Sequence, residues 1–230
     1  MIYVLSEYFM ITYKNKDNEN ARVRRRFNFV MDKAFELFVE KGIGPVTMVE
    51  IADACNFGVA TLYRYFGTKK ELVIAIGTKK WQEYAVWVEE AYRARNGETM
   101  TAREELEFYI DSYLELYRNH KDILTFNSNF DMFVVHEHAT AQEMKAYYDS
   151  VAVFSGKFHT VVEKAKVDGT IRTDIPEQDM FYGVMYTMLT VATKFAFGTV
   201  YPVDYKIDYS QSLDLLKQMF MTYYTPVERG

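Results

Sequence analysis

The chain has 230 residues, 49% of them hydrophobic, a net charge of −5 and a single cysteine, Cys55. This length suits one or two domains with a sizeable core. One cysteine excludes internal disulfides and a cysteine-based zinc site, and no apolar run is long enough to span a membrane. Residues 1–80 hold 13 Lys and Arg against 9 Asp and Glu, whereas residues 81–230 hold 14 against 23. A basic N-terminal part on an acidic body is typical of a nucleic-acid-binding module joined to a second domain.

An N-terminal extension, residues 1–21, precedes the first periodic segment. Residues 1–13 are apolar and aromatic but lack the basic start and the small-residue cleavage site of a signal peptide. Residues 14–20 are polar and typical of a linker. The arginines that follow end with Arg26 and are placed to contact DNA phosphates, although a solvated charge run is the alternative. From 27 to 38, apolar residues recur at the spacing of one helix face, which predicts the first helix.

Residues 47–66 have the pattern of two short helices joined by a tight turn. Thr47 and Glu50 form a capping box, in which the hydroxyl accepts from an N–H of the first turn and the carboxylate reaches back. Asn56 tolerates the left-handed backbone conformation that a sharp turn needs, and Gly58 can cap the second helix. Two such helices predict a helix-turn-helix, whose second helix enters a DNA major groove. The alternative is an ordinary helical hairpin in a core.

The side chains of the second short helix favour the DNA-binding interpretation. Leu62 and Phe66 lie four residues apart and are expected to face inward. Thr61 and Arg64 can contact base edges, and hydroxyl or ammonium donors nearby suit phosphates. The predicted DNA-contacting residues are Arg26, Thr47, Val59, Ala60, Thr61, Tyr63, Arg64, Tyr65 and Lys69.

The rest of the chain is predicted to be helical as well. Apolar periodicity predicts helices over about 69–95, 102–119, 141–167, 178–198 and 210–224, and 122–135 is short, apolar and less regular. All four prolines lie outside these helices and no alternating strand pattern occurs, so we predict an all-α fold. The fourth of these helices is apolar on nearly every side, which indicates burial against its own domain and against a partner subunit.

Few residues in the chain suggest catalytic or metal chemistry. His136 and His138 could share a metal ion, but no third ligand is evident, and we interpret them as solvated loop residues. The sequence has no phosphate-binding loop, no dinucleotide glycine motif and no nucleophile elbow. We therefore predict no metal, no cofactor and no enzymatic activity. Cys55 is interpreted as a small helix-packing residue, with a redox-sensing thiol as the alternative.

Aromatic residues are numerous in the second half of the chain. Aromatic and methionine side chains suit an adaptable apolar cavity, although aromatic stripes are often simply core packing. The predicted ligand-binding residues are Tyr113, Tyr117, Phe126, Phe130, Phe133, Phe154 and Phe158.

Residues 30–72 resemble the DNA-binding domain of the TetR family of bacterial helix-turn-helix transcriptional regulators. The matching positions are 34–42, Thr47, 50–52 and 61–72, in a fixed order over more than forty residues. Three positions in the turn depart from the family pattern, namely Asn56, Phe57 and Gly58. A Gly–x–Ile–Arg–x–Asp–x–Pro–Glu arrangement over 169–177 extends the resemblance weakly into the second domain.

The resemblance implies about nine helices in two domains. A three-helix DNA-binding domain would cover 22–68, and a ligand-binding and dimerisation domain would cover 69–230, with 1–21 as an extension. The helix after the helix-turn-helix would transmit the ligand signal. A ligand cavity would be enclosed by helices of the second domain, and the last two helices would build a four-helix dimer interface. The predicted interface residues are Gly183, Thr187, Thr190, Leu216, Met219 and Phe220.

The function that the resemblance implies is that of a cytoplasmic homodimeric transcriptional regulator, most often a repressor. Its partners would be a palindromic operator in double-stranded DNA, a second copy of the chain and a small apolar or aromatic effector that releases the DNA. The alternative is a helical ligand-binding or enzymatic protein that has lost specific DNA binding.

Overall fold

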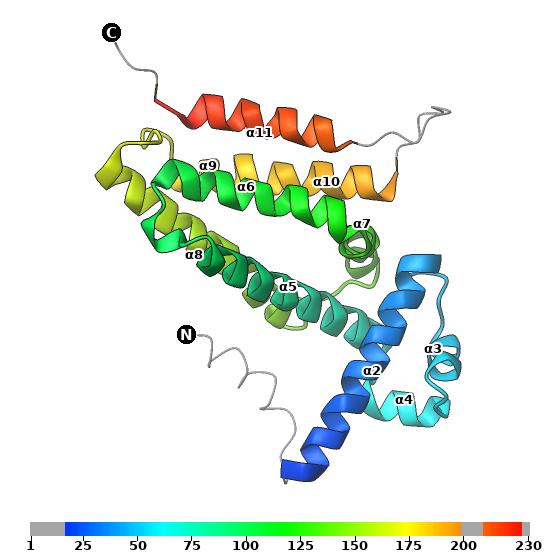
Figure 1. Cartoon of the computed structure of the whole chain (residues 1–230). Helices are drawn as coiled ribbons and strands as arrows, with labels where there is room; N and C mark the ends of the chain where they lie inside the picture. Colours follow the sequence, from blue (N-terminus) through cyan, green and yellow to red (C-terminus); the bar gives the residue numbers. More distant parts are fainter. Residues whose placement is uncertain (1–16, 199–208, 227–230) are drawn as a thin grey trace.

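The computed structural model describes residues 17–198 and 209–226 (Figure 1). Within these ranges every regular element is a helix, which confirms the all-α prediction. Because α9, η2 and α10 follow one another without a break, the described residues form nine helices, together with the short 3₁₀ turn η1. The elements are α2 (Asp17–Lys41), α3 (Met48–Ala54), α4 (Val59–Tyr65), α5 (Lys69–Ala94), η1 (Gly97–Thr99), α6 (Ala102–Asn119), α7 (Lys121–His136), α8 (Lys145–Asp168), α9 (Glu177–Phe181), η2 (Tyr182–Tyr186), α10 (Thr187–Phe197) and α11 (Ser210–Tyr224).

The N-terminal module, which we call the head, consists of α2, α3 and α4 packed on the start of α5 (Figure 1). Phe38 of α2, Ile51 of α3 and Leu62 of α4 are fully buried in one core. The first helix begins at Asp17 rather than near Phe27, so the prediction of a linker is wrong for its last residues. Residues 17–26 contain no glycine or proline that would stop a helix. Residues 1–16 of the predicted extension lie outside the described residues.

The turn between α3 and α4 forms as the sequence predicted. The Thr47 hydroxyl accepts from the Glu50 backbone N–H at 3.2 Å, and the Glu50 carboxylate accepts from the Thr47 N–H at 2.8 Å, which completes the capping box. Asn56 has a φ of 53°, in the left-handed region. Gly58 is the N-cap of α4 without a side chain to cap it. These contacts fix the direction in which α4 leaves the turn.

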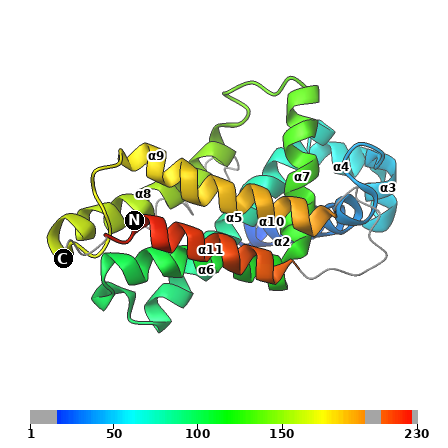
Figure 2. The same ribbon diagram turned by 90° about the horizontal axis from the view of Figure 1, so that it is seen from above.

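Helices α5 to α11 form the second unit, which we call the body. Its core is made mainly by side chains from α5, α6, α8, the continuous helix α9–η2–α10 and α11, and α5 runs from the head into it (Figure 1). Helices α10 and α11 lie side by side on the outside of the body (Figures 1 and 2). The fully buried members of this core include Val88, Leu106, Ile110, Val161, Val184 and Leu213.

Helix α7 differs from the sequence prediction. The segment 122–135, expected to be less regular, is part of a helix of 16 residues. Phe126, Phe130 and Val134 recur every fourth residue and form one buried face of it. The following helix begins at Lys145 rather than near residue 141. Helix α7 packs against α10 of the body and against α2 of the head, and so lies between the two units (Figure 2).

Candidate DNA-binding surface and effector cavity

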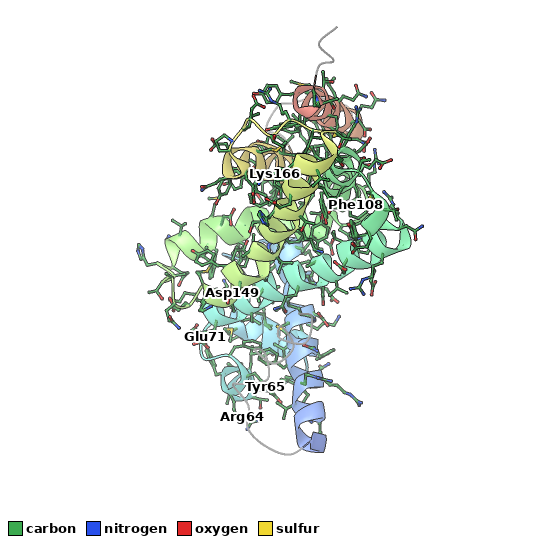
Figure 3. The ribbon with its side chains drawn as sticks, turned by 90° about the vertical axis from the view of Figure 1, so that its left-hand side faces the viewer. Arg64, Tyr65, Glu71, Phe108, Asp149 and Lys166 are labelled. Carbon is green, nitrogen blue, oxygen red and sulfur yellow. The ribbon has the colours of Figure 1, made fainter. Side chains whose placement is uncertain are left out.

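Helix α4 presents one face to solvent and buries the other. Leu62 is fully buried, whereas Tyr63 is 49% exposed, and Ala60 and Arg64 are also exposed. The other three predicted contact residues of this helix, Val59, Thr61 and Tyr65, are half-buried. Figure 3 shows Arg64 and Tyr65 at the end of the molecule that lies away from α11. The exposed face is therefore available to a groove of DNA.

Aromatic contacts hold α4 in place from behind. The Phe66 ring, directly after the helix, stacks on Phe27 of α2 with 4.4 Å between ring centroids. Tyr65 and Phe57 lie 6.5 Å apart, and Phe57 is 6.2 Å from Phe29. Offset rings at such distances pack favourably. The tilt of α4 is consequently set by α2, although Phe57 departs from the family pattern.

The predicted phosphate donors outside α4 differ in the contacts that they already make within the protein. Arg26 is exposed on α2. Thr47 is exposed as well, but its hydroxyl also donates to the Glu50 carboxylate at 3.1 Å. The Lys69 ammonium donates to the Gly44 carbonyl at 2.8 Å and lies 5.3 Å from the centre of the Phe133 ring. Partial burial lowers the pKa of Lys69. Lys69 thus ties α5 to the loop before α3.

A small cavity lies in the body between α6, α8 and η2. Its volume is about 10 Å³, close to the least that holds one water molecule. Three of the predicted ligand-binding residues, Tyr113, Phe154 and Phe158, meet at this cavity. A ligand larger than water would have to separate these helices. The remaining lining residues, which the sequence did not single out, are Tyr109, Ser112, Lys157 and Met185.

The other four predicted ligand-binding residues lie elsewhere. Phe126 and Phe130 are buried in the core of the head, and Phe133 packs at its edge. Tyr117 is buried in the body core, where its hydroxyl accepts from the Tyr209 N–H at 3.3 Å. The seven residues therefore do not line one cavity. Tyr109 and Ser112 lie on the same stripe of α6 as Tyr113, and this spacing could have predicted that they line the cavity too.

Hydroxyl groups supply most of the polar chemistry of the cavity. The Tyr84 hydroxyl donates to Ser112 at 2.9 Å, and the Ser112 hydroxyl donates to the Tyr109 carbonyl at 2.7 Å. The Tyr109 hydroxyl donates to Glu105 at 3.3 Å. Burial raises the pKa of Tyr84, Tyr109 and Tyr113, so all three phenols stay protonated at neutral pH. Lys157 is paired with Glu89.

The outer face of α10 and α11 carries exposed apolar side chains. Leu215, Met219 and Tyr223 recur every fourth residue on α11, and Met219 is 60% exposed. Tyr182 and Tyr186 are exposed on the neighbouring η2. Of the predicted interface residues, Met219 and Thr190 are exposed, and the half-buried ones are Gly183, Thr187, Leu216 and Phe220. Large apolar side chains exposed at a regular spacing along one helix, as on α11, are typical of an interaction surface.

Three other features limit the possible chemistry. No helix among the described residues is long and apolar enough to cross a membrane. In the same part of the chain, no three His, Cys, Asp or Glu residues are grouped so that they could hold a metal ion. Cys55 is buried against the head core, and its burial raises the pKa of the thiol, so Cys55 packs as a small apolar residue.

The family comparison matches the helix-turn-helix region. Residues 30–76 match the model of the bacterial regulatory proteins of the tetR family. A comparison with curated protein sequences finds no match.

Solved structures match nearly the whole chain in fold. A regulatory protein in the tetR family from Rhodococcus RHA1 has a TM-score of 0.66 and 14% identity, with 88% of this chain and 98% of that chain covered. FadR from Bacillus subtilis in complex with stearoyl-CoA has a TM-score of 0.63 and 16% identity, with 84% of this chain and 97% of that chain covered. AibR in complex with isovaleryl coenzyme A and operator DNA has a TM-score of 0.60 and 19% identity, with 84% of this chain and 97% of that chain covered.

These findings define the fold of the chain. The chain shares the helical fold of the solved tetR-family structures, with an N-terminal helix-turn-helix domain and a helical second domain. Residues 30–76 match the model of this family, which confirms the resemblance seen in the sequence.

Proposed function

We propose that the chain is a ligand-responsive transcriptional repressor that binds a palindromic operator as a homodimer. The observation that carries the proposal is the exposed face of α4, where Ala60, Tyr63 and Arg64 face solvent while Leu62 anchors the helix. An arginine and small residues on such a face suit the edges of bases in a major groove. Arg26, outside this helix, would contact phosphates.

A homodimer is supported by the apolar face of α10 and α11. Its exposed residues form a stripe on α11 that a second copy of the chain can cover. Two-fold symmetry would then place two copies of α4 in successive major grooves, about one helical turn apart. The modest positive charge of residues 1–80 fits this arrangement, because two heads double the number of phosphate contacts.

The effector is proposed to be a small molecule with an apolar acyl or aromatic group. The cavity around Tyr113, Phe154 and Phe158 offers aromatic rings and buried hydroxyls, and its one charged lining residue, Lys157, is neutralised by its pairing with Glu89. Two proteins of similar fold were solved with stearoyl-CoA and with isovaleryl coenzyme A. An effector that opens this cavity would favour a conformation with lower DNA affinity, and DNA would weaken effector binding by the same factor.

The second candidate function is a helical ligand-binding protein without specific DNA binding. It is favoured by the internal engagement of two predicted phosphate donors, since Thr47 is part of its capping box and Lys69 is bonded to Gly44. An enzymatic role has no comparable observation in its favour.

Selection from random duplex DNA separates the two functions. Purified protein, unfolded and refolded to remove any bound small molecule, is mixed with pooled duplexes at low salt, and the bound fraction is sequenced. An enriched palindrome supports the repressor proposal. Equal recovery of all sequences would contradict it and favour the second candidate. When Arg64→Ala is tested on the enriched duplex, Arg118→Ala serves as its control, because Arg118 is a surface arginine that pairs with Asp214 on the body.

A further inference from the structure

A row of aromatic rings begins at the effector cavity. Phe154, which lines the cavity, lies 5.8 Å from Trp81 of α5, with the two rings edge to face. The indole N–H of Trp81 donates to the Tyr147 hydroxyl at 3.3 Å. Three rings from α8, α5 and α8 again are therefore in direct contact, and Trp81 is buried among them.

The row continues through α7 into the head. Tyr147 stacks on Phe130 with 4.5 Å between centroids, and Phe130 lies 5.8 Å from Phe126. The Phe126 ring is 5.4 Å from Phe35 on α2. Rings from four helices thus form one continuous series of contacts from the cavity to the helix on which α4 is packed.

The ring in the middle of the row, Phe130, is tightly packed. Phe130 is fully buried, and its ring packs so closely on Gly77 of α5 that a Cβ there would lie 2.8 Å from it. Interiors packed at this density transmit displacements instead of absorbing them. A shift of Tyr147 must therefore move Phe130 or the helix that carries it.

Helix α7 is part of the body, but its buried face packs in the core of the head. Phe126, Phe130 and Val134 of α7, together with Met144 just before α8, are buried in the same cluster as Phe38 of α2. The two cores meet where Tyr147 contacts Trp81, because Trp81 is buried in the body core.

We infer that the six rings of Phe154, Trp81, Tyr147, Phe130, Phe126 and Phe35 carry the effector signal from the cavity to the head. This inference rests on the proposed effector cavity. A ligand that displaces Phe154 would move Trp81 and, through the hydrogen bond to Tyr147, the face of α7 that is packed in the head. Helix α5 supplies a parallel backbone connection, but the rings couple the cavity to α2 without passing through the length of α5.

The inference is tested by hydrogen exchange on the full chain without DNA or ligand. Phe154→Leu shortens the first ring of the row. The matched control is Phe181→Leu, since Phe181 is also half-buried on the body core but its ring partners are Phe158 and Tyr182. We expect Phe154→Leu to speed exchange in α2 by roughly 3- to 30-fold relative to α11, whereas Phe181→Leu does not change this ratio. The ratio to α11 removes the effect of global destabilisation.

Tyr147→Phe then separates the two routes. This change keeps the ring that stacks on Phe130 and removes the hydrogen bond to Trp81. In a double-mutant cycle, the effect of Phe154→Leu on α2 should largely disappear when Tyr147 is Phe. An unchanged effect in that background, or no effect on α2 in either, would overturn the inference. Because no DNA is present, this outcome is independent of whether the chain binds an operator.

Discussion

Lys70 and Glu143 form an ion pair of 2.6 Å that joins the first turn of α5 to the residue pair just before α8. The same carboxylate accepts from the backbone N–H of Thr140 at 2.7 Å and from its hydroxyl at 2.9 Å. The loop after α7 is thereby fixed to the helix that leaves the head. The ion pair adds a polar contact four residues before Tyr147, where the aromatic rings of α8 and α7 meet.

The ion pair predicts a specific dependence of stability on pH. The hydrogen bond from Lys70, with those from Thr140, lowers the pKa of Glu143 from 4.5 to about 2. A lowered carboxyl pKa stabilises the fold above the unfolded value and loses this contribution as the pH falls from 4.5 to about 2. Glu143→Gln should therefore lower the free energy of unfolding at pH 7, and the difference from wild type should shrink below pH 4.5.

Urea unfolding at pH 7 and in the acid range measures this difference. Glu90→Gln, an exposed position on α5, is the control for removing one negative charge. A difference between wild type and Glu143→Gln that is constant across the acid range would mean that the pair does not act as described.

Gly77 predicts an effect of a single methyl group. Gly77→Ala places a Cβ 2.8 Å from Phe130, so the ring must shift within a filled core. We expect the free energy of unfolding to fall by about 1–3 kcal/mol. Gly156→Ala, in α8 with nothing within 4 Å of the new Cβ, should instead raise it by about 0.5–1 kcal/mol. Denaturant unfolding of both variants checks the opposite signs, and equal signs would contradict the packing argument.

The apolar face of α11 predicts the oligomeric state. Met219→Glu should convert the proposed dimer to a monomer in sedimentation equilibrium, because it buries a charge without a partner in the interface. Val167→Glu is the control, since Val167 is 90% exposed at the end of α8. A variant Met219→Glu that sediments like wild type would place the subunit contact elsewhere.

Lys69 predicts a change in DNA affinity that does not depend on sequence. If its ammonium contacts a phosphate in addition to Gly44, Lys69→Met should weaken binding to all duplexes and reduce the salt slope by about 1. Titrations at several salt concentrations measure that slope. If the salt slope of DNA binding stays that of wild type while the free energy of unfolding falls, Lys69 only holds the loop before α3.

Much of the head could be predicted because its signals are local. The capping box of Thr47, the left-handed Asn56 and the inward Leu62 each depend on neighbours within a few residues. The all-α fold class followed from apolar periodicity and the positions of the prolines. The arrangement of the helices in two domains came from the resemblance, which carries information that periodicity does not. The segment 122–135 was predicted to be short and less regular, although its buried positions recur every fourth residue, at Phe126, Phe130 and Val134.

The cavity could be predicted only in part. Periodicity identifies a buried face but not the core toward which that face turns, so Phe126 and Phe130 were assigned to the body although they pack in the head. Lys157 was missed because a lysine on an aromatic helix is usually at the surface, and here it is paired with Glu89 beside the cavity. Long-range packing of this kind leaves no mark in a single sequence.

The most direct test of the account is the affinity of Arg64→Ala for the duplex enriched from random DNA, compared with a scrambled duplex of the same composition. We predict a loss of about 1–3 kcal/mol on the enriched duplex, a much smaller loss on the scrambled one, and no change on either for Arg118→Ala. If Arg64→Ala binds both duplexes as tightly as wild type, α4 is not the recognition helix, and the proposed mode of DNA binding is wrong.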